Sequence, residues 1–429
     1  MKLDIPYLNR SFLLDVPNEN LLGVAEPNEI EVSGTPEEIL THALEHPFGP
    51  DGKPGKSFDD FLAGAETVLV IVNDATRPTP TEAMLGALLP AFRRLGIPVK
   101  NLLILVATGA HRAPTEPEYR QILGSLYDTL RMRCFNHDSR NESGLIELGT
   151  TRNGTPIVLN RMLFQMDRII ATGSVEPHYF AGFTGGRKAF LPGVAAFRTI
   201  KANHKLALSP IARSLALDGN PVHEDMMDAL PFLKAPIFSF MTVLNKEQRV
   251  AAAAAGDLLG SFYVAVETAK RIFCVSISTK ADIVVSVAKF PMDIDLYQSQ
   301  KAIDNGALAL KDGGTLILVS SCRDGIGDEA YANLLAQAGS PADAIERIRA
   351  GYELGYHKAA KMAEVSARAT VLAITDLPPQ RLRSMFIEPA ASPQEALNRA
   401  LADARTKGIA VPKVLILPDG CVTVPILRD

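Results

Sequence analysis

One short stretch of the chain, residues 171–206, combines two histidines, a glycine-rich run and a basic pair. His178 comes before the glycine-rich run, Lys188 follows it closely, and His204 lies a few helical turns further on. Glycines let backbone N–H groups approach a ligand, and a helix N-terminus offers N–H donors and a partial positive charge. The stretch could therefore hold a phosphate, a reactive amine and a metal ligand. The glycines of the run are Gly182, Gly185 and Gly186.

Each of these features also has an ordinary structural explanation. Glycine-rich loops serve many purposes, and a histidine inside a predicted helix, such as His204, is usually a surface or half-buried residue. A histidine at a strand end, such as His111, is more often a turn residue than a catalyst. Asp74 could cap the helix that follows it. Coincidence explains each residue adequately but explains the whole set poorly. We interpret the remaining histidines as structural: His42, His46, His137, His223 and His357.

Several polar clusters follow predicted strands, and we expect them to meet at one edge of a sheet. Ligands of open α/β sheets bind beyond the carboxyl ends of the strands. The clusters are DATRPTP at residues 74–80, TGAHR at residues 108–112, GSVEPH at residues 173–178 and AKFPMD at residues 288–293. The last cluster leads into YQSQK at residues 297–301, where Gln298 and Lys301 share one face of a helix. These clusters could converge on one cleft between two domains.

The elements that must position these residues alternate along the chain. Residues 68–72 and 101–107 are short apolar runs, as expected of parallel strands that are covered on both faces. Helices are predicted at residues 81–95 and 116–130, and a third strand ends at residue 172. Strands that alternate with helices in this way indicate a doubly wound α/β layer.

A second α/β series follows an alanine-rich segment at residues 251–271, which we interpret as a helical connector between two domains. Its predicted strands are residues 283–287, 315–319 and 371–374, and its predicted helices are residues 296–310, 341–349 and 393–407. The chain is therefore predicted to be a two-domain α/β protein with mainly parallel sheets and an active-site cleft between the domains. We place the N-terminal domain at residues 1–265, beginning with a hairpin or meander, and the C-terminal domain at residues 275–411. The tail 412–429 could pack with the first domain.

The composition narrows the class of protein. A chain of 429 residues is longer than one core usually supports, so two domains are the default expectation. A formal net charge of −4 argues against a general nucleic-acid binder, and four scattered cysteines without a CxxC pair indicate reduced thiols. The N-terminus lacks the apolar run of a signal peptide, and no apolar segment is long enough to cross a bilayer. We expect a cytoplasmic protein that binds neither nucleic acid nor membranes, with its oligomeric state left open.

Five motifs together resemble the nickel-pincer lactate racemase family, which includes lactate racemases and related 2-hydroxy acid racemases and epimerases. The motifs are DATRPTP, ATGAHR at residues 107–112, EPHYFAGFTGGRKAFLPG at residues 176–193, ANH at residues 202–204 and YQSQK. They are collinear and spread over both predicted domains, and the long central block is the specific one. The resemblance implies a two-domain α/β isomerase that binds a nickel pincer nucleotide covalently. This cofactor is pyridinium-3,5-bisthiocarboxylic acid mononucleotide with Ni²⁺, made by cofactor-synthesis proteins.

Carried over residue by residue, the resemblance implies a role for each motif. Lys188 would tether the cofactor through a thioamide, and His204 would supply the nickel ligand that comes from the protein. His111 and His178 would be the paired acid/base groups. The substrate, a small 2-hydroxy acid, would be held by Arg77, Tyr297, Gln298 and Lys301. Further contacts to the cofactor or support for its site would come from Asp74, Thr76, Gly182, Gly185 and Gly186.

The residue types are compatible with this chemistry. Imidazole is a good nickel ligand, and a planar S,C,S pincer plus one nitrogen suits square-planar Ni(II). The carboxylate makes the neighbouring carbon a poor proton acid, so hydride transfer to the cofactor is the easier route to racemisation. A histidine on each side of the substrate can take the hydroxyl proton, because imidazole serves as either acid or base. Arg77 can bind a carboxylate bidentately.

Three alternatives stay open. Family lactate racemases place a tryptophan near the substrate, whereas this chain has none, so a longer 2-hydroxy acid such as a sugar acid, malate or an aryl lactate is the first alternative. The polar Gln300 favours the same alternative. A non-catalytic carrier of the nickel nucleotide would need Lys188 and His204 but not both His111 and His178. A zinc-dependent hydrolase that used His111, His178 and His204 would lack a close HxxxH pair or a nearby carboxylate ligand among these residues.

Overall fold

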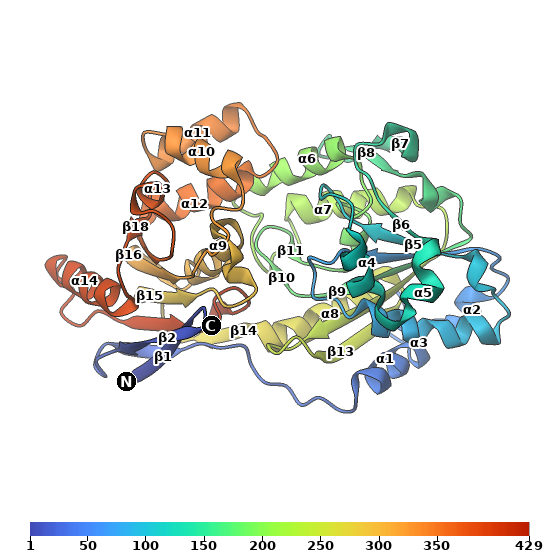
Figure 1. Cartoon of the computed structure of the whole chain (residues 1–429), viewed down its shortest axis with the longest axis horizontal. Helices are drawn as coiled ribbons and strands as arrows, with labels where there is room; N and C mark the ends of the chain where they lie inside the picture. The colour runs from blue at the N-terminus through green and yellow to red at the C-terminus, as the bar shows by residue number, and fades with distance from the viewer. Residues whose placement is uncertain (429) are drawn as a thin grey trace. The chain divides into compact units, whose positions relative to one another are not determined.

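The computed structural model describes residues 1–428, and the chain forms two compact units (Figure 1). The central unit is Glu29–Ile272, and the terminal unit combines Met1–Asn28 with the chain from Phe273 onward. Both units contain mainly parallel sheets connected by helices, which confirms the predicted α/β class.

A six-stranded sheet forms the middle of the central unit, in the order β13-β12-β9-β4-β5-β6. Its neighbouring strands are parallel except at one edge, where β13 runs antiparallel to β12. This topology confirms the doubly wound layer that the sequence predicts. The strands are β4 (Val68–Asn73), β5 (Leu102–Ala107), β6 (Cys134–Asn136), β9 (Arg168–Ser174), β12 (Ile237–Leu244) and β13 (Val250–Gly256).

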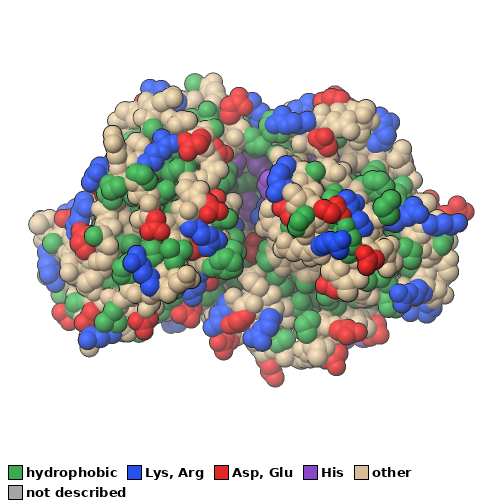
Figure 2. Space-filling model, in the orientation of Figure 1, with side chains coloured by type: hydrophobic (Ala, Val, Ile, Leu, Met, Phe, Trp, Pro, Cys, Tyr) green, Lys and Arg blue, Asp and Glu red, His purple; other side chains and the backbone are tan. Residues whose placement is uncertain are grey.

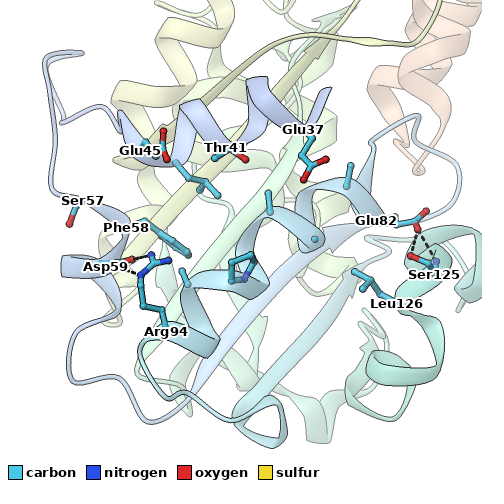
Figure 3. Close-up of a pocket in the computed structure, with 16 residues that line it drawn as sticks. Glu37, Thr41, Glu45, Ser57, Phe58, Asp59, Glu82, Arg94, Ser125 and Leu126 are labelled. Carbon is cyan, nitrogen blue, oxygen red and sulfur yellow. Dashed lines mark hydrogen bonds and ion pairs between the residues drawn. The ribbon is translucent and has the colours of Figure 1, made fainter. Parts of the chain in front are cut away.

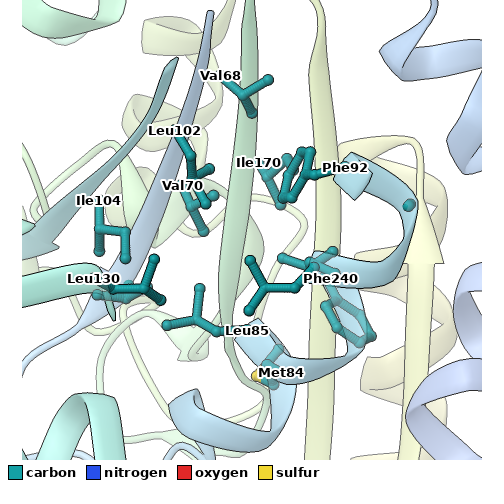
Figure 4. Close-up of a cluster of buried hydrophobic side chains, with 14 of the residues drawn as sticks. Val68, Val70, Met84, Leu85, Phe92, Leu102, Ile104, Leu130, Ile170 and Phe240 are labelled. Carbon is teal, nitrogen blue, oxygen red and sulfur yellow. The ribbon is translucent and has the colours of Figure 1, made fainter. Parts of the chain in front are cut away.

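Strand β4 illustrates why these apolar runs form the middle of the sheet. Residues 68–72 are each at most 1 % exposed, so both faces of the strand are covered. Alternate residues of a strand point to the same face, and Val68 and Val70 lie in one apolar cluster with Leu85 of α3 (Thr81–Arg94) (Figure 4). Burial of each such side chain stabilises the fold by roughly 1.5–3 kcal/mol. The alternating valines therefore fix the side of β4 that α3 covers.

The remaining elements of the central unit are helices and two small hairpins. The helix predicted at residues 116–130 is divided into two, because Gly124 takes a φ of +52° after the first part. The helices besides α3 are α1 (Pro36–Glu45), α2 (Phe58–Leu62), α4 (Glu116–Leu123), α5 (Tyr127–Leu130), α6 (Phe197–Lys205), α7 (Pro221–Ala229) and α8 (Leu258–Phe273). The hairpins are β7 (Leu145–Thr150) with β8 (Pro156–Asn160), and β10 (Pro177–His178) with β11 (Gly182–Phe183).

The alanine-rich segment is not the continuous helix that the sequence predicts. Its alanines form strand β13, and only the residues after Gly256 form helix α8. Alanine by itself favours a helix, but here the alanines pair antiparallel with β12, and Phe48 approaches the end of the strand. The N–H of Phe48 donates to the carbonyl of Ala255 at 2.8 Å, and a Cβ on Gly256 would lie 2.2 Å from the Phe48 oxygen. Tertiary packing therefore overrides local propensity in this segment.

The terminal unit contains a second six-stranded sheet, in the order β18-β17-β16-β15-β19-β3, with all neighbours parallel. Both ends of the chain contribute to this sheet, because Leu21 of β3 lies opposite Val414 of β19. Residues 1–28 therefore belong to this unit rather than to the N-terminal domain in which the sequence pattern placed them. The tail from residue 412 to residue 428, which could have packed with the first domain, also belongs to this unit. The strands are β3 (Leu21–Val24), β15 (Ala281–Val287), β16 (Leu310–Val319), β17 (Thr370–Ile374), β18 (Glu388–Pro389) and β19 (Val414–Leu417).

Helices and two further strand pairs complete the terminal unit. The hairpin predicted at the N-terminus is β1 (Lys2–Tyr7) with β2 (Arg10–Asp15), and its Leu14 lies in one buried cluster with Leu397 of α14. The other pair is β14 (Cys274–Ile277) with β20 (Val424–Leu427). The helices are α9 (Leu296–Gly306), α10 (Glu329–Gln337), α11 (Pro341–Ala350), α12 (Tyr356–Arg368), α13 (Pro379–Arg383) and α14 (Pro393–Thr406).

The surface carries charges of both signs. On the face that Figure 2 shows, Lys and Arg side chains are interspersed with Asp and Glu side chains on each unit. A nucleic-acid binder usually presents a continuous basic stripe, and this face presents none. Within residues 1–428, none of the helices has the length and apolar character needed to cross a membrane.

Candidate active site

The loops after β4 and β5 bring Asp74 and His111 together. In the parallel register Asn73 lies opposite Ala107, so both loops start at the same level of the sheet. The Asp74 carboxylate oxygen Oδ2 lies 2.7 Å from His111 Nδ1. Because the carboxylate accepts, Nδ1 carries the proton and Nε2 is the ring nitrogen left for chemistry. The Asp74 side chain is 8 % exposed and the His111 side chain 52 % exposed. A buried carboxylate therefore holds an imidazole that is accessible to solvent.

Asp74 is itself held in place by Thr76. Its Oδ1 accepts hydrogen bonds from the Thr76 backbone N–H at 3.2 Å and the Thr76 hydroxyl at 2.6 Å. Burial alone would raise the pKa of Asp74, but the hydrogen bonds from His111 and Thr76 outweigh burial, and the pKa is lowered. The carboxylate therefore stays ionised and accepts the hydrogen bond from His111. Helix α3 begins at Thr81 after Pro80 and has no side-chain cap, so Asp74 does not cap that helix.

The glycine-rich stretch places a second histidine against a lysine. His178 ends β10, and Lys188 lies in the 3-10 turn Gly186–Ala189. His178 Nε2 and Lys188 Nζ are 3.2 Å apart. The N–H of Ala181 donates to His178 Nδ1 at 3.3 Å, so both ring nitrogens of His178 have a hydrogen-bond partner. An amine this close to the glycine-rich turn is a group that can act as a nucleophile when it is unprotonated.

Phe180 contacts three of the predicted site residues, although the sequence pattern gave it no role. Its side chain is 2 % exposed, and its ring lies edge-on to the rings of His178 and His204, with centroids 4.5 and 5.0 Å apart. The Lys188 amine lies 5.4 Å from the same ring centroid. The hairpin, the turn and α6 therefore place their predicted site residues around one aromatic ring. The available signal was the aromatic pair Tyr179-Phe180 between His178 and the glycine run.

Arg187 precedes Lys188 but is completely buried. Its guanidinium donates to the carbonyls of Ala181 and Phe183 at 2.7 and 2.9 Å, and to His223 Nδ1 at 3.0 Å. Burial lowers the pKa of Arg187 to about 9, and burial together with the Arg187 charge lowers the pKa of His223 to about 3. A neutral His223 thus accepts from a charged guanidinium and fixes the hairpin beside Lys188. Sequence reasoning recognised only a basic pair here.

The glycines of the run have a packing reason for their identity. Gly182, Gly185 and Gly186 all take positive φ, which other residues rarely adopt. A Cβ on Gly182 would lie 2.2 Å from a backbone oxygen, and a Cβ on Gly186 would lie 2.9 Å from the Phe262 ring. The N–H of Gly186 donates to the sulfur of Met241 at 3.3 Å. The glycines therefore permit close packing inside the unit, and their role in binding a cofactor stays a prediction.

Hydrogen bonds between the loops hold these groups in one region. The N–H of Gly109, in the loop of His111, donates to the carbonyl of Gly193, shortly after Lys188, at 2.9 Å. Arg77 lies exposed on the loop of Asp74, and its charge helps to lower the pKa of that carboxyl group. A polar network that sequence reasoning missed joins the ends of β4, β9 and β12, and it consists of Asn73, Thr79, Ser174 and Thr242.

The predicted substrate residues Tyr297, Gln298 and Lys301 lie on α9 of the terminal unit. The carboxylate of Asp295 accepts from the Gln298 N–H at 2.6 Å and thereby caps the start of α9. All three side chains are half-buried. Since Gln298 and Lys301 are three residues apart on this helix, they share one face as predicted.

Lys358 of α12 and Asp304 of α9 itself change the interpretation of the polar residues on α9. Lys358 donates to the carbonyl of Tyr297, and its ammonium lies 4.2 Å from the Tyr297 ring centroid. Burial lowers the pKa of Lys358 to about 8 and raises the pKa of its neighbour Asp304 to about 6. Gln300 is fully buried and donates to the Lys358 carbonyl at 2.8 Å. The side-chain amide of Gln300 therefore makes its hydrogen bond inside the unit, so its polarity gives no information about the substrate.

Comparison with known proteins identifies relatives over the whole chain. Two family models match, described as the lactate racemase N-terminal domain over residues 7–214 and the lactate racemase C-terminal domain over residues 277–425. A lactate racemase of Thermoanaerobacterium thermosaccharolyticum is 31 % identical over 97 % of both chains. A lactate racemase of Lactiplantibacillus plantarum is 30 % identical over 97 % of this chain and 98 % of its own.

Solved structures give the same result for the fold. The structure of the lactate racemase apoprotein from Thermoanaerobacterium thermosaccharolyticum matches all of both chains with a TM-score of 0.91 and 30 % identity. A crystal structure of a protein from Thermotoga maritima matches 93 % of this chain and all of its own with a TM-score of 0.68. At 18 % identity, this second match indicates a shared fold alone.

Proposed function

The chain belongs to the lactate racemase family, and from that premise we propose that it interconverts the two enantiomers of a 2-hydroxy acid, with lactate as the first substrate. Membership makes the chain an isomerase that acts on a small molecule. The observation that carries the proposal is a pair of histidines with different partners, His111 beside Asp74 and His178 beside Lys188. A reaction that must run from either face of one carbon uses two proton-transfer groups, and these two imidazoles are suited to the task.

The side chains of the central unit fit the nickel pincer nucleotide that the resemblance implies. Lys188 would tether it, and the position of its amine beside His178 in the glycine-rich turn supports that assignment, because an imidazole can take a proton from an amine that is to form a thioamide. His204 would supply an imidazole nitrogen, which is a good ligand for Ni(II). Both residues lie around the Phe180 ring. When bound, the nucleotide supplies an acceptor and donor of hydride for the substrate carbon.

The remaining residues would bind the substrate and move its hydroxyl proton. His111 and His178 would each hold the hydroxyl proton of one enantiomer. Asp74 keeps the proton of His111 on Nδ1, so Nε2 would meet the hydroxyl oxygen. Arg77 would bind the carboxylate through two parallel hydrogen bonds. On the terminal unit, the proposed substrate contacts are Tyr297, Gln298 and Lys301.

The substrate class extends beyond lactate in this proposal. The chain has no tryptophan, whereas the family resemblance implies one near the substrate of lactate racemases. A pocket without that side chain could accept a longer 2-hydroxy acid, and a sugar acid, malate or an aryl lactate are the first choices. Lactate and these longer acids share the carboxylate and the hydroxyl on which Arg77 and the two histidines would act.

The proposal is tested with holoprotein that is co-expressed with the cofactor-synthesis proteins. Enantiopure lactate and the longer acids are incubated separately, and chiral chromatography measures the loss of configuration. We expect at least one acid to reach a nearly equal mixture from either enantiomer. His111→Ala, loaded with nickel to the same extent, is the control and should fail. A nickel-loaded wild-type protein that leaves every acid unchanged would instead match a non-catalytic carrier of the nucleotide.

A further inference from the structure

Helix α1 ends in a cluster of metal-binding side chains that the candidate active site does not use. His42, Glu45 and His46 form the sequence HxxEH, and all three side chains are exposed. One ligand atom from each lies within 4.8 Å of the other two. Residues three and four positions apart are neighbours on a helix, so His42 faces both Glu45 and His46. The sequence pattern suggested that both histidines are structural, yet neither is part of a core.

His46 already has the tautomer that metal sites use. Its ring Nδ1 lies 3.0 Å from the carbonyl oxygen of His42, and since a carbonyl only accepts, Nδ1 donates and carries the proton. Metal-binding histidines commonly donate one ring N–H to a carbonyl and bind the ion through the other nitrogen. The backbone N–H of His46 donates to the same oxygen at 3.0 Å, so the ring and the chain are both fixed. Nε2 of His46 is then the nitrogen that can bind an ion.

The geometry of the cluster requires only small movements to enclose an ion. The two imidazole centroids are 4.1 Å apart, with the rings tilted by 34°. Ligand atoms that share one ion at about 2.1 Å lie roughly 3–3.5 Å from one another. The ligand atoms of the three side chains lie within 4.8 Å of one another, and rotation of these exposed side chains can bring them to the shorter distance. The rings are therefore close enough to share an ion without a change in the helix.

The charges around the cluster favour a cation. The C-terminal end of a helix carries a partial negative charge, and α1 ends at Glu45. Glu45 also lines a groove of about 710 Å³ between α1 and α3, together with Glu37 and Glu82 (Figure 3). None of the residues proposed for racemisation lines this groove. Arg94 also lines the groove, whereas neither imidazole does, so Glu45 is the carboxylate that the groove and the cluster share. The three glutamates add negative charge on the side of α1 that carries Glu45.

We propose that His42, Glu45 and His46 bind one divalent transition-metal ion, such as Zn²⁺ or Ni²⁺, at the surface of the central unit. Two of the three ligands are imidazole nitrogens, which select these ions over Mg²⁺ and Ca²⁺. Water would fill the remaining positions, so the site would be open and of moderate affinity. The ion would join the last turn of α1 to its C-cap residue and thereby stabilise the end of the helix. The site is independent of the proposed racemase activity.

The test uses apoprotein expressed without the cofactor-synthesis proteins and stripped of metal with a chelator. Equilibrium dialysis against ZnCl₂ measures binding, and the melting temperature is followed with and without Zn²⁺. We expect one ion per chain with micromolar affinity and a higher melting temperature. The double variant His42→Gln/His46→Gln should bind at least about tenfold more weakly and lose the shift in melting temperature. Glutamine keeps a polar side chain and a good helix propensity, so circular dichroism should be unchanged.

Two matched variants distinguish an ion at the end of α1 from an ion bound elsewhere on the chain. Glu37→Gln removes one charge from the same helix and groove but no ligand, so it should keep the affinity of the wild type. His204→Ala removes the proposed nickel ligand and should keep Zn²⁺ binding at α1. Wild-type apoprotein that binds no Zn²⁺, or a double variant that binds as tightly as the wild type, would overturn the proposal. Zn²⁺ binding that is lost in His204→Ala would also overturn it, because the ion would then occupy the other site.

Discussion

Two loops of the central unit each present a histidine, but the two histidines have opposite kinds of partner. His111 stands against the buried carboxylate of Asp74, and His178 stands against the amine of Lys188. A carboxylate can only accept a hydrogen bond from an imidazole, whereas the nitrogen of a lysine can donate or accept according to its protonation state. The same residue type therefore has a partner with a fixed hydrogen-bonding role in one place and a partner with a variable role in the other.

Lys188 is the partner that the proposed cofactor would change. Its amine lies 3.2 Å from His178 Nε2. A thioamide formed on Lys188 would replace that amine, so the surroundings of His178 Nε2 would differ between the apoprotein and the cofactor-bound protein. The contact between Asp74 and His111 would be the same in both.

The largest effect is expected at Lys188, which affects both the tether and the partner of His178. Lys188→Ala should abolish covalent attachment and leave no measurable racemisation, because no other group in the turn supplies the amine. Mass spectrometry of the peptide that contains residue 188 measures the adduct. Lys56→Ala removes an exposed lysine of the same unit and serves as the control. An adduct found on a different lysine would contradict the assignment.

The second-largest effect is expected at Asp74, the hydrogen-bond partner of His111. Asp74→Asn keeps the shape of the side chain but offers an amide that can donate to His111 Nδ1, so the ring would carry its proton on the wrong nitrogen. We expect kcat to fall by roughly a hundredfold, with nickel content unchanged. Asp228→Asn, which changes a carboxylate paired with Arg152, is the control. A change of less than about twofold in kcat would mean that Asp74 does not orient a catalytic group.

A smaller effect is expected from a substitution of Arg77, which we propose binds the substrate carboxylate. Arg77→Lys keeps the positive charge but loses the planar fork that binds a carboxylate bidentately. We expect kcat/KM to fall by about tenfold, mostly through KM, since ground-state binding is weakened. Steady-state kinetics on the active substrate measure the change, with Arg94→Lys on α3 as the control. No change on any substrate would indicate that Arg77 does not bind the carboxylate.

The smallest effect concerns stability in acid. The folded-state pKa of Asp74 is lowered from its ordinary value, which is about 3.9 in an unfolded chain. The resulting stabilisation is complete above about pH 4 and is lost as the pH falls through the lower folded-state pKa. The urea midpoint of the wild type should therefore decrease more steeply below about pH 4 than that of Asp74→Asn. Parallel curves for the two proteins would mean that the His111 and Thr76 contacts do not stabilise the ionised carboxylate.

Sequence patterns predicted what depends on neighbouring residues along the chain. Continuous apolar runs gave β4 and β5 with nearly correct ends, and the polar residues after them gave Asp74 and His111, which the structure brings into contact. Parallel strands that end at one edge explain this success, because the residue after each strand is placed by the sheet itself. His178 and Lys188 are close for a similar reason, since a short hairpin and a turn separate them.

The failures depend on contacts between distant parts of the chain. The alanines of β13 are helix formers by propensity, but their antiparallel pairing with β12, together with the approach of Phe48 at one end, makes them a strand. The pairing of β3 with β19 joins segments at opposite ends of the sequence, so no local pattern could assign both to one unit. Buried polar contacts also cannot be recognised from the sequence. The polarity of Gln300 suggested a longer substrate, but its side-chain amide donates to the carbonyl of Lys358 inside the unit.

The claim that two histidines act on opposite faces of the substrate is tested most directly by single turnovers of His111→Ala and His178→Ala. Each variant is loaded with cofactor, confirmed by mass and nickel content, and mixed with one pure enantiomer of the active substrate. Trapping with a hydrazine reagent then measures the keto acid formed in one turnover. Each variant keeps one base, so each should oxidise one enantiomer well and the other poorly, by roughly a hundredfold.

We expect the two variants to prefer opposite enantiomers and neither to racemise in the steady state. His111→Ala would rely on His178, and His178→Ala would rely on His111 oriented by Asp74. The same enantiomer preference in both variants, or full racemisation by either one, would contradict the two-base mechanism for this protein.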